Sequence, residues 1–381
     1  MKIVKSLLFL SAVIFLSCNN ADTTEKQAGP EKLNDGWIVS TPVAEDLKPD
    51  LIAEALAYSA DNRKLDALII IKNGKLVVER YANGYGPGKL HKVWSITKAV
   101  TATITGIAID KGHIPSELEP MYKYLRGYPM QHTSLQAVSI EHLLSMTSGF
   151  AWKELGGPGS PGYELPYSSD WVAFTLQLPH SSPGKEFSYN TGSYMLFAPI
   201  IKNTTGMQAD EFAKTHLFES LGINNYQWDK QSEFWTKTKG DELKGARDPG
   251  TIKYSDTFAA FTNTGSGLHM LPRDMAKIGQ LYLDKGKWNG KQIVSEAWVN
   301  KAIQGHYDNT AYGYGWRLMS YEINGKQYPA YFASGFGQQS IIVIPDMQMV
   351  VVLAQQHYDS MPEGDRLTSE LMNKYILSAA L

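Results

Sequence analysis

Cysteine is almost absent from this 381-residue chain, which has only Cys18. A single cysteine near the N-terminus excludes an internal disulfide, a structural zinc–thiolate site and a cysteine nucleophile in the body of the protein. An excess of one charge is also lacking, since 36 Lys and Arg stand against 38 Asp and Glu, for a formal net charge of −2. Because no long basic run is present, we expect no nucleic-acid partner.

Sequence signatures of metal and cofactor sites are lacking as well. No two of the nine histidines lie four residues apart, and Glu141-His142 is not part of a His-Glu-x-x-His pattern. We therefore expect no metal site. The chain has no phosphate-binding glycine loop and no dinucleotide fingerprint, so we expect no cofactor.

Residues 1–18 have the pattern of an export signal. Lys2 and Lys5 precede an apolar run at 7–16, which is shorter than the ~20 residues that a stable membrane span needs. The following Phe-Leu-Ser-Cys at 15–18 resembles the lipobox of bacterial lipoproteins, although leucine is more usual than phenylalanine at its first position. The resemblance implies that Cys18 is lipidated and becomes the mature N-terminus. The alternative is an incidental cysteine in a plain signal peptide.

Residues 19–36 are polar and predict a flexible tether ahead of a folded domain at 37–381. More than one acyl chain on Cys18 would hold the protein on a membrane surface. We therefore expect a cell-envelope protein, anchored by lipid to the periplasmic or surface side of a bacterial membrane after signal cleavage.

The folded domain has the composition of a globular protein, since the chain is 43% hydrophobic and 19% charged. Its length exceeds that of a usual single core, so two cores or one large α/β core are expected. An Asn73-Gly74 turn joins strand patterns at 67–71 and 75–81. Strand patterns return late in the chain, at 313–323, 326–333, 340–344 and 347–354. Helical patterns at 49–59 and 368–379 flank these strands.

The middle of the chain favours helix and loop. Apolar runs at 171–178 and 194–201 predict helices, although Pro199 weakens the second prediction. The sequence therefore predicts an α/β (α+β) fold. An antiparallel sheet flanked by N- and C-terminal helices comes from about 37–94 and 250–381, and a helical part comes from about 95–249. A ligand cleft is expected where the two parts meet.

Ser95-Ile96-Thr97-Lys98 is the most informative motif, because it places a hydroxyl and an amine three residues apart at the start of a helical pattern. Residues at that spacing share one helix face. A buried lysine can then take the proton of a serine nucleophile. The alternative is an N-cap serine. The same spacing at Ser182–Lys185 encloses Pro and Gly, which are poor helix residues, so that pair need not share a face.

Four ordered segments resemble the serine β-lactamase and penicillin-binding-protein superfamily. The branch is the class C-like serine hydrolases, which include esterases and 6-aminohexanoate-dimer hydrolase. The segments are Trp94–Thr101 (WSITKAVT), Glu141–Gly149 (EHLLSMTSG), Pro183–Gly192 (PGKEFSYNTG) and Ser334–Gln338 (SGFGQ). The resemblance covers about residues 63–356 and implies the family's fold, an antiparallel sheet with flanking helices plus an all-helical domain.

The resemblance also implies a mechanism. Ser95 is acylated, Lys98 acts in proton transfer, and Tyr189 passes the proton to the leaving group and later helps to activate water. The backbone N–H groups of Ser95 and Phe336 form the oxyanion hole, and an N–H at a helix start suits an anion. Tyr189 as a core aromatic, and Gly335-Phe336-Gly337 as a plain turn, are the alternatives.

Substrate contacts are expected from a small set of residues in or near these segments: Trp152, Asn190, Thr191, Gly335, Gly337 and Gln338. Trp152 and Glu154 could instead order their loop, and Gln338 could bond only its neighbours. Thr191 replaces the asparagine of a Tyr-x-Asn motif. The Ser334-Gly335-Phe336 segment lacks the cation that grips a substrate carboxylate, a charge-assisted bond commonly worth ~1.5–3 kcal/mol.

We therefore expect an exported serine hydrolase that cleaves an ester or small amide, or a short peptide, through an acyl-serine intermediate. The runner-up is a β-lactamase or D,D-peptidase that acts on cell-wall D-peptides. The rival from another class is a non-catalytic lipoprotein that binds peptidoglycan or a partner.

Overall fold

The computed structural model describes residues 29–130, 132–233, 260–309 and 311–381. The predicted signal peptide, Cys18 and the expected domain boundary at 249/250 lie outside these residues.

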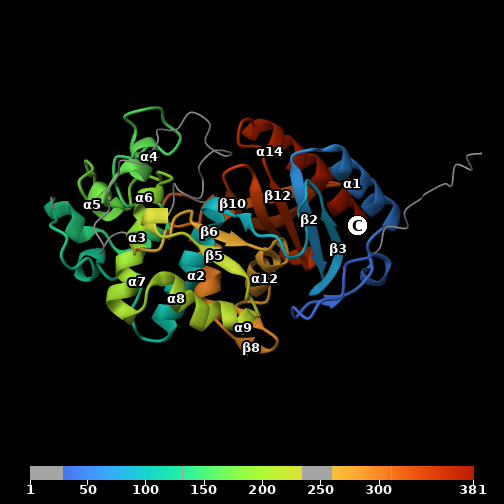
Figure 1. The fold of residues 1–381 in the computed structure, drawn as a ribbon, viewed down its shortest axis with the longest axis horizontal. Helices are drawn as coiled ribbons and strands as arrows, with labels where there is room; N and C mark the ends of the chain where they lie inside the picture. Colours follow the sequence, from blue (N-terminus) through green and yellow to red (C-terminus); the bar gives the residue numbers. More distant parts are fainter. Residues whose placement is uncertain (1–28, 131, 234–259, 310) are drawn as a thin grey trace, which may run out of the picture.

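One seven-stranded sheet forms an end of the molecule (Figure 1), with the order β1-β3-β2-β12-β11-β10-β9. Neighbouring strands are antiparallel, except β1 and β3, which are parallel. The strands are β1 (Ile38–Val39), β2 (Leu65–Lys72), β3 (Lys75–Tyr81), β9 (Arg317–Ile323), β10 (Lys326–Gly335), β11 (Gln339–Ile344) and β12 (Met349–Gln355). The pairing of β2 with β12 joins the two ends of the chain, as the sequence predicts.

Period-two alternation divides this sheet between two cores. In β2, Ile69 and Ile71 belong to one core, and Leu68 and Ile70 to the other. The second core is covered by α1 (Pro49–Asp61), α14 (Met361–Glu370), a π-helical turn (Leu371–Ile376) and α15 (Leu377–Ala379). The first core lies under α12 (Pro272–Leu283) and continues into the helical region.

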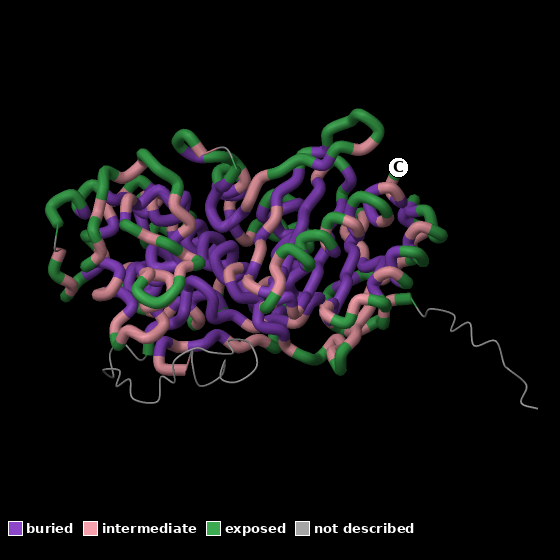
Figure 2. Tube along the Cα trace, turned by 90° about the horizontal axis from the view of Figure 1, so that it is seen from above, coloured by how far each residue is buried: buried purple, intermediate pink, exposed green. Residues whose placement is uncertain are grey.

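The helical region surrounds α2 (Thr97–Asp110), whose side chains are buried on almost every side. Figure 2 shows that buried chain continues from this region into the sheet. The threonines and Lys98 of α2 are buried together with its apolar residues, which places this helix inside the core. The other helices are α3 (Ile140–Leu144), α4 (Pro161–Glu164), α5 (Trp171–Leu176), α6 (Thr191–Met195), α7 (Phe197–Thr205), α8 (Ala209–Ala213) and α9 (Glu219–Leu221).

A small sheet, β4-β6-β5, lies between the two regions (Figure 1). Its strands are β4 (His91–Lys92), β5 (Tyr226–Trp228) and β6 (Leu268–Met270). A hairpin of β7 (Lys287–Trp288) and β8 (Lys291–Gln292), and helix α13 (Glu296–Ala302), complete the fold. This small sheet was not predicted, because its strands are only two or three residues long and show no periodic pattern.

Several boundaries differ from the prediction. The strand expected at 313–323 begins at Arg317, and the helix expected at 171–178 ends at Leu176. The run at 194–201 is divided between α6 and α7 near Leu196, and Pro199 lies in the first turn of α7, where proline is tolerated. The closing helix begins at Met361. The chain is also fastened before the expected end of the tether at residue 36, because Arg273 donates to a carboxylate oxygen of Asp35 at 2.8 Å.

Within the described residues, no helix combines the length and apolar character needed to cross a bilayer. The same part of the chain contains no cluster of His, Cys, Asp and Glu suited to a metal ion.

Candidate active site

Ser95 lies in a short 3-10 turn, Trp94–Ile96, directly before α2. The N-cap of α2 is Ile96, so the alternative of an N-cap serine is wrong. Trp94 has φ +49°, a left-handed conformation that costs a bulky residue about 1–3 kcal/mol. The turn is held to β6 by two hydrogen bonds, because Val93 N donates to Leu268 O at 3.0 Å and Leu268 N donates to Thr97 Oγ1 at 3.1 Å.

Lys98 lies one helical turn further along, and its side chain has no exposed surface. Its Nζ lies 2.8 Å from Ser95 Oγ, 3.0 Å from Thr191 Oγ1 and 2.8 Å from the carbonyl oxygen of Gly265. The predicted spacing therefore brings the serine and the amine into hydrogen-bond contact. The two further oxygens fix the direction of the amine.

Tyr189 faces the same amine, with Lys98 Nζ 5.1 Å from the centroid of its ring. The ring also packs edge-on against Tyr312, at 6.0 Å between centroids. Burial, reinforced by the nearby Tyr189, raises the pKa of Tyr312 well above its ordinary value, and burial does the same for Tyr194. Both of those tyrosines therefore stay neutral, while Tyr189 is half-buried at the edge of the site.

A pocket of about 250 Å³ opens beside Ser95. Its polar lining comes from Ser95, Glu154, Thr191 and Ser266. The rest of its wall is mainly apolar, from Trp94, Leu155, Tyr163, Leu165, Pro166, Trp171, Met195 and Phe336. Such a wall suits an apolar group on the substrate.

Phe336 follows the end of β10 and packs its ring against Trp94, at 5.5 Å between centroids. This contact brings the expected second oxyanion donor to the turn that carries Ser95. Gly335 permits the approach, because a Cβ there would lie 2.2 Å from the carbonyl oxygen of Val93. This close approach is to the residue directly before the Ser95 turn (Trp94–Ile96), and the expected substrate contact of Gly335 stays a prediction. Gly337 likewise faces the protein, where a Cβ would meet the Tyr358 ring.

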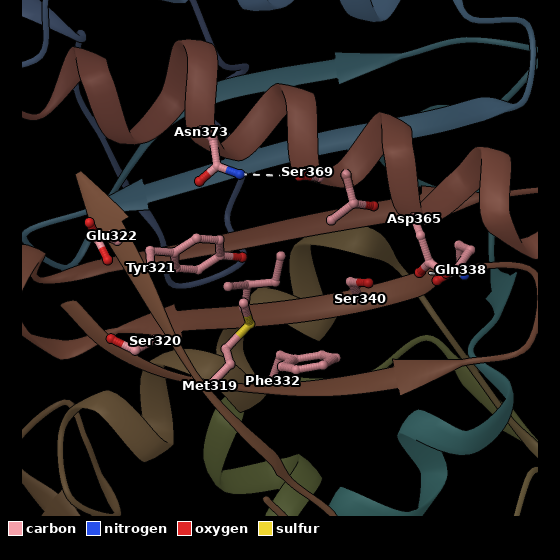
Figure 3. A pocket seen from close by; sticks show the side chains of 12 residues that line it. Met319, Ser320, Tyr321, Glu322, Phe332, Gln338, Ser340, Asp365, Ser369 and Asn373 are labelled. Atoms are coloured by element: carbon pink, nitrogen blue, oxygen red, sulfur yellow. Dashed lines mark hydrogen bonds between the residues drawn. The ribbon is translucent and has the colours of Figure 1, made fainter. Parts of the chain in front are cut away.

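Gln338 and Asn190 do not line the pocket at Ser95. The Gln338 side chain points to the other side of the sheet, where it donates to Asp365 Oδ1 at 2.7 Å and to the carbonyl oxygen of Met361 at 3.0 Å (Figure 3). Asn190 is buried, and its side chain accepts from the backbone N–H of Ser193 as the N-cap of α6. Both placements differ from the expected substrate contact, since local hydrogen bonds already fix these side chains.

Trp152 and Glu154 lie on the loop between α3 and α4 and form one hydrogen-bonded unit. Trp152 Nε1 donates to Glu154 Oε2 at 2.6 Å. Glu154 lines the pocket and accepts bonds from Thr191, whereas Trp152 supports Glu154 from behind the wall. Of the two roles considered for Trp152, the structure favours ordering of the loop.

Sequence reasoning missed Arg317, a cation beside the third motif. Arg317 Nε donates to Ser334 Oγ at 3.3 Å, and the guanidinium carbon lies 4.9 Å from the centroid of the Tyr189 ring. The register of the hairpin formed by β9 and β10 predicts this contact. A two-residue turn at Asn324-Gly325 pairs Arg317 with Phe332, and a residue diagonal to that pair is Ser334.

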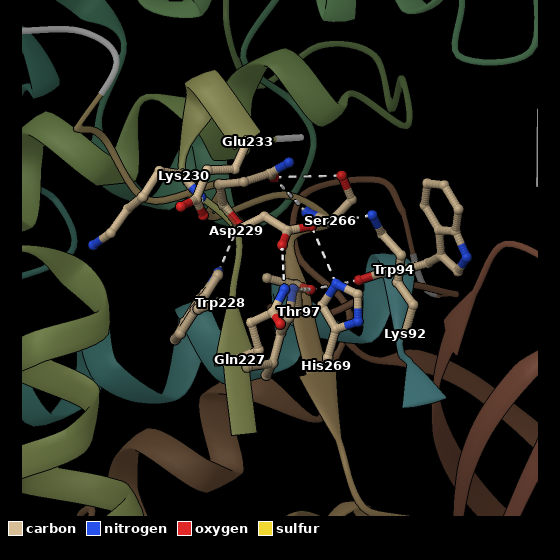
Figure 4. A network of polar contacts seen from close by, with 12 residues as sticks. Lys92, Trp94, Thr97, Gln227, Trp228, Asp229, Lys230, Glu233, Ser266 and His269 are labelled. Atoms are coloured by element: carbon tan, nitrogen blue, oxygen red, sulfur yellow. Dashed lines mark hydrogen bonds and ion pairs between the residues drawn. The ribbon is translucent and has the colours of Figure 1, made fainter. Parts of the chain in front are cut away.

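A buried ionic network on and next to β4, β5 and β6 supports the nucleophile turn, which is the 3-10 turn Trp94–Ile96 that carries Ser95 (Figure 4). Asp229 Oδ2 lies 3.2 Å from Lys92 Nζ and 3.1 Å from His269 Nε2. Lys92 Nζ in turn lies 4.5 Å from the centroid of the Trp94 ring. Burial by itself would raise the pKa of Asp229, but His269 and Lys92 together hold it below its ordinary value.

Comparison with known proteins agrees with the resemblance found in the sequence. A family model described as Beta-lactamase matches residues 54–371. A 6-aminohexanoate-dimer hydrolase of Paenarthrobacter ureafaciens is 24% identical over 252 residues, which cover 63% of this chain and 57% of that protein. The chain therefore spans little more than half of that relative's length.

Solved structures show the same fold at low identity. EstCE1, described as a hydrolase with promiscuous acyltransferase activity, is 14% identical with a TM-score of 0.66, over 86% of this chain and 99% of that one. A penicillin-binding protein homologue from Caulobacter crescentus is 16% identical with a TM-score of 0.63, over 88% of this chain and 99% of that one. The predicted architecture is thereby confirmed.

Proposed function

Because this chain belongs to the beta-lactamase family, whose members are serine hydrolases, we propose that it cleaves an ester or small amide through an acyl intermediate on Ser95. The observation that carries the proposal is the fully buried Lys98 amine at 2.8 Å from Ser95 Oγ. A nucleophile needs an adjacent base within hydrogen-bond reach.

The proposed reaction has two similar halves. Ser95 Oγ bonds to the substrate carbonyl carbon as its proton moves to Lys98 Nζ, and the carbonyl oxygen takes the negative charge. The backbone N–H groups of Ser95 and Phe336 stabilise that oxyanion. Its collapse expels the leaving group, which receives the proton from Lys98 through Tyr189. Water then replaces the leaving group and releases the acid from Ser95 by the same steps.

The apolar pocket supports a substrate with an apolar acyl or leaving group. Eight of the side chains that line it are aromatic, aliphatic, proline or methionine, and the carboxylate of Glu154 is the negative charge among them. A substrate carboxylate placed against Glu154 would be repelled. This arrangement favours a neutral ester or amide over an acidic ligand in this part of the site.

A second candidate function, D,D-peptidase or β-lactamase activity, is favoured by Arg317. Its guanidinium lies beside Ser334 and Tyr189, and a guanidinium binds carboxylates in two parallel bonds. The cation absent from the third motif is thus supplied by the neighbouring strand β9.

The same proposal places the protein in the cell envelope. The lipobox-like segment at Cys18 supports export and lipid anchoring of the mature chain.

Intact-mass measurement of the domain after Cys18 tests the function. The domain is incubated in parallel with a fluorophosphonate, a p-nitrophenyl ester and a penicillin, with Ser95→Ala as the matched control. We expect a fluorophosphonate adduct and ester turnover, both lost in the control. A penicillin adduct would favour the second candidate. No adduct on folded protein from any probe would favour the non-catalytic binder.

A further inference from the structure

We propose that Glu154 is a positioning residue, which acts through the Thr191 hydroxyl to aim the Lys98 lone pair at Ser95 in the form of the amine that the proposed base role requires. The inference rests on the proposed function, because it assigns a task within that reaction. It follows from counting the donors and acceptors around three side chains.

The Glu154 carboxylate fixes the direction of the Thr191 hydroxyl. Its Oε2 accepts from the backbone N–H of Thr191 at 3.0 Å and from Trp152 Nε1 at 2.6 Å. Its Oε1 makes a short contact with Thr191 Oγ1. An ionised carboxylate can only accept hydrogen bonds, so Thr191 must donate its single hydroxyl proton to Glu154.

The direction of the Thr191 hydroxyl then fixes the role of Lys98. With its proton committed to Glu154, Thr191 Oγ1 faces Lys98 Nζ as an acceptor, at 3.0 Å. The carbonyl oxygen of Gly265, at 2.8 Å from the same nitrogen, is always an acceptor. A neutral amine has two N–H donors and one lone pair. Both donors are taken by these oxygens, so the lone pair is left for the proton of Ser95 Oγ at 2.8 Å.

Glutamine at position 154 would reverse this arrangement. One amide oxygen has to serve the two N–H groups of Thr191 and Trp152, which leaves the amide NH2 facing Thr191 Oγ1. The Thr191 hydroxyl proton would then turn towards Lys98 Nζ and take its lone pair. The opposite amide orientation would set the NH2 group against two donors, which leaves them unsatisfied.

The carboxylate is held tightly enough for this task. The Trp152 indole, which donates to Glu154, packs against the first turn of α6, where a Cβ on Gly192 would lie 2.8 Å from the indole ring. Thr191 is the first residue of that helix. The loop and the helix therefore share one fixed contact at the base of the site.

The test measures the rate at which a fluorophosphonate labels Ser95, by intact mass. We expect Glu154→Gln to slow labelling about 100-fold, since misplacing a reacting group by about 1 Å can cost that much. Glu164→Gln is the matched control, because Glu164 ends α4, the helix that follows this loop, and accepts from the backbone N–H of Gly159. It should label at the wild-type rate.

A double-mutant cycle separates positioning from a direct or merely structural effect. Thr191→Val removes the hydroxyl, so Glu154→Gln should slow labelling no further in that background. Thr191→Ser keeps the hydroxyl and should stay within about threefold of the wild-type rate. If Glu154→Gln slows labelling equally in the wild-type and Thr191→Val backgrounds, Glu154 acts independently of Thr191 and the inference is overturned.

Two further outcomes are decisive. If Glu154→Gln does not fold, the Thr191 pair decides, because equal labelling of Thr191→Val and Thr191→Ser contradicts the inference. Wild-type labelling of Ser95 with no change in folded Glu154→Gln overturns the inference and leaves the proposed function standing. A wild-type Ser95 that takes no label overturns the proposed function itself, and the positioning role with it.

Discussion

The Lys98 amine has no solvent contact, and its three nearest polar partners come from three separate parts of the chain. Only Ser95 is close in sequence; Thr191 and Gly265 are brought to it by α6 and by the segment ahead of β6. This explains why spacing alone could predict the Ser95–Lys98 pair. The direction of the amine depends on tertiary contacts that no local pattern carries.

Replacing either member of the pair should abolish turnover. We expect Ser95→Ala and Lys98→Ala each to lower ester hydrolysis by about 10⁵–10⁶-fold, because groups that act as one unit fail together. For the same reason the double variant should be no worse than either single one. The check is kcat/KM for a p-nitrophenyl ester, with circular dichroism to establish folding. Near-normal turnover by Lys98→Ala would remove Lys98 as the base.

Arg317 distinguishes the two candidate functions. Arg317→Gln should weaken acylation by a penicillin or a D-Ala-ended peptide about 10- to 100-fold, because a charge-assisted bond to the substrate carboxylate is lost. Hydrolysis of a neutral ester should change less than about threefold by the same reasoning. The measurement is the second-order acylation rate with each class. Equal losses on both classes would show that Arg317 serves the site rather than the carboxylate.

At the scale of elements, the position of the nucleophile turn depends on the packing of Gly315 against the first turn of α2. Gly315 has φ +79° and lies so close that a Cβ there would be 2.8 Å from Ala99 Cα. We expect Gly315→Ala to destabilise the protein by about 2 kcal/mol or more, from the left-handed backbone and the clash together. Activity should fall too, because the displaced turn carries Lys98.

Gly325→Ala is the matched control for Gly315→Ala. Gly325 has a similar φ of +75°, but a Cβ there would have no other atom within 4 Å, so only the backbone cost of about 1 kcal/mol applies. Chemical unfolding of both variants gives the comparison. Equal destabilisation, or full activity in Gly315→Ala, would contradict the importance of this contact.

The Asp229 network should make stability depend on pH. The pKa of Asp229 is lowered on folding, so its contribution is complete above about pH 4 and is lost as the pH falls through the lower folded-state value. Asp229→Asn should cost about 3–5 kcal/mol at neutral pH, because it leaves the buried Lys92 without its carboxylate.

Urea unfolding between pH 2.5 and 7 checks this expectation. The difference between wild type and Asp229→Asn should shrink towards the acid end. Glu119→Gln removes an exposed pair with Lys123 and should leave the unfolding free energy nearly unchanged. A pH-independent difference for Asp229→Asn would mean that the carboxylate is not ionised in the folded protein.

Element prediction succeeded where periodicity was strong and failed where tertiary packing decides. The Asn73-Gly74 and Asn324-Gly325 turns and their flanking strands were predicted close to their observed bounds. The division between α6 and α7 was missed, because an apolar run predicts one helix whether or not it bends. The register across the second hairpin pairs Arg317 with Phe332 and so places it near Ser334.

For the whole molecule, the large sheet combines strands from both ends of the chain, and the pattern of early and late strands predicts this arrangement. The pocket beside Ser95 lies where the helical region meets the sheet. The sequence does not predict to which side of the sheet each loop side chain points. Gln338 follows the oxyanion segment in sequence yet lies on the other side of the sheet (Figure 3).

The proposed location is tested on the full chain. We expect Cys18→Ala to release the protein from membranes into the soluble fraction, because burial of the acyl chains is lost. Fractionation with a high-salt wash, together with metabolic labelling by a fatty acid, gives the readout. A Cys18→Ala protein that stays with the membrane would contradict the lipid anchor.

The central claim is that Lys98 activates Ser95, and the rate of fluorophosphonate labelling tests it most directly, with the adduct mapped by peptide mass. The account predicts one adduct on Ser95 in the wild type and labelling at least about 10²-fold slower in folded Lys98→Ala, the range typical of a lost general base. Labelling of Lys98→Ala at the wild-type rate, or an adduct on another residue, would contradict it.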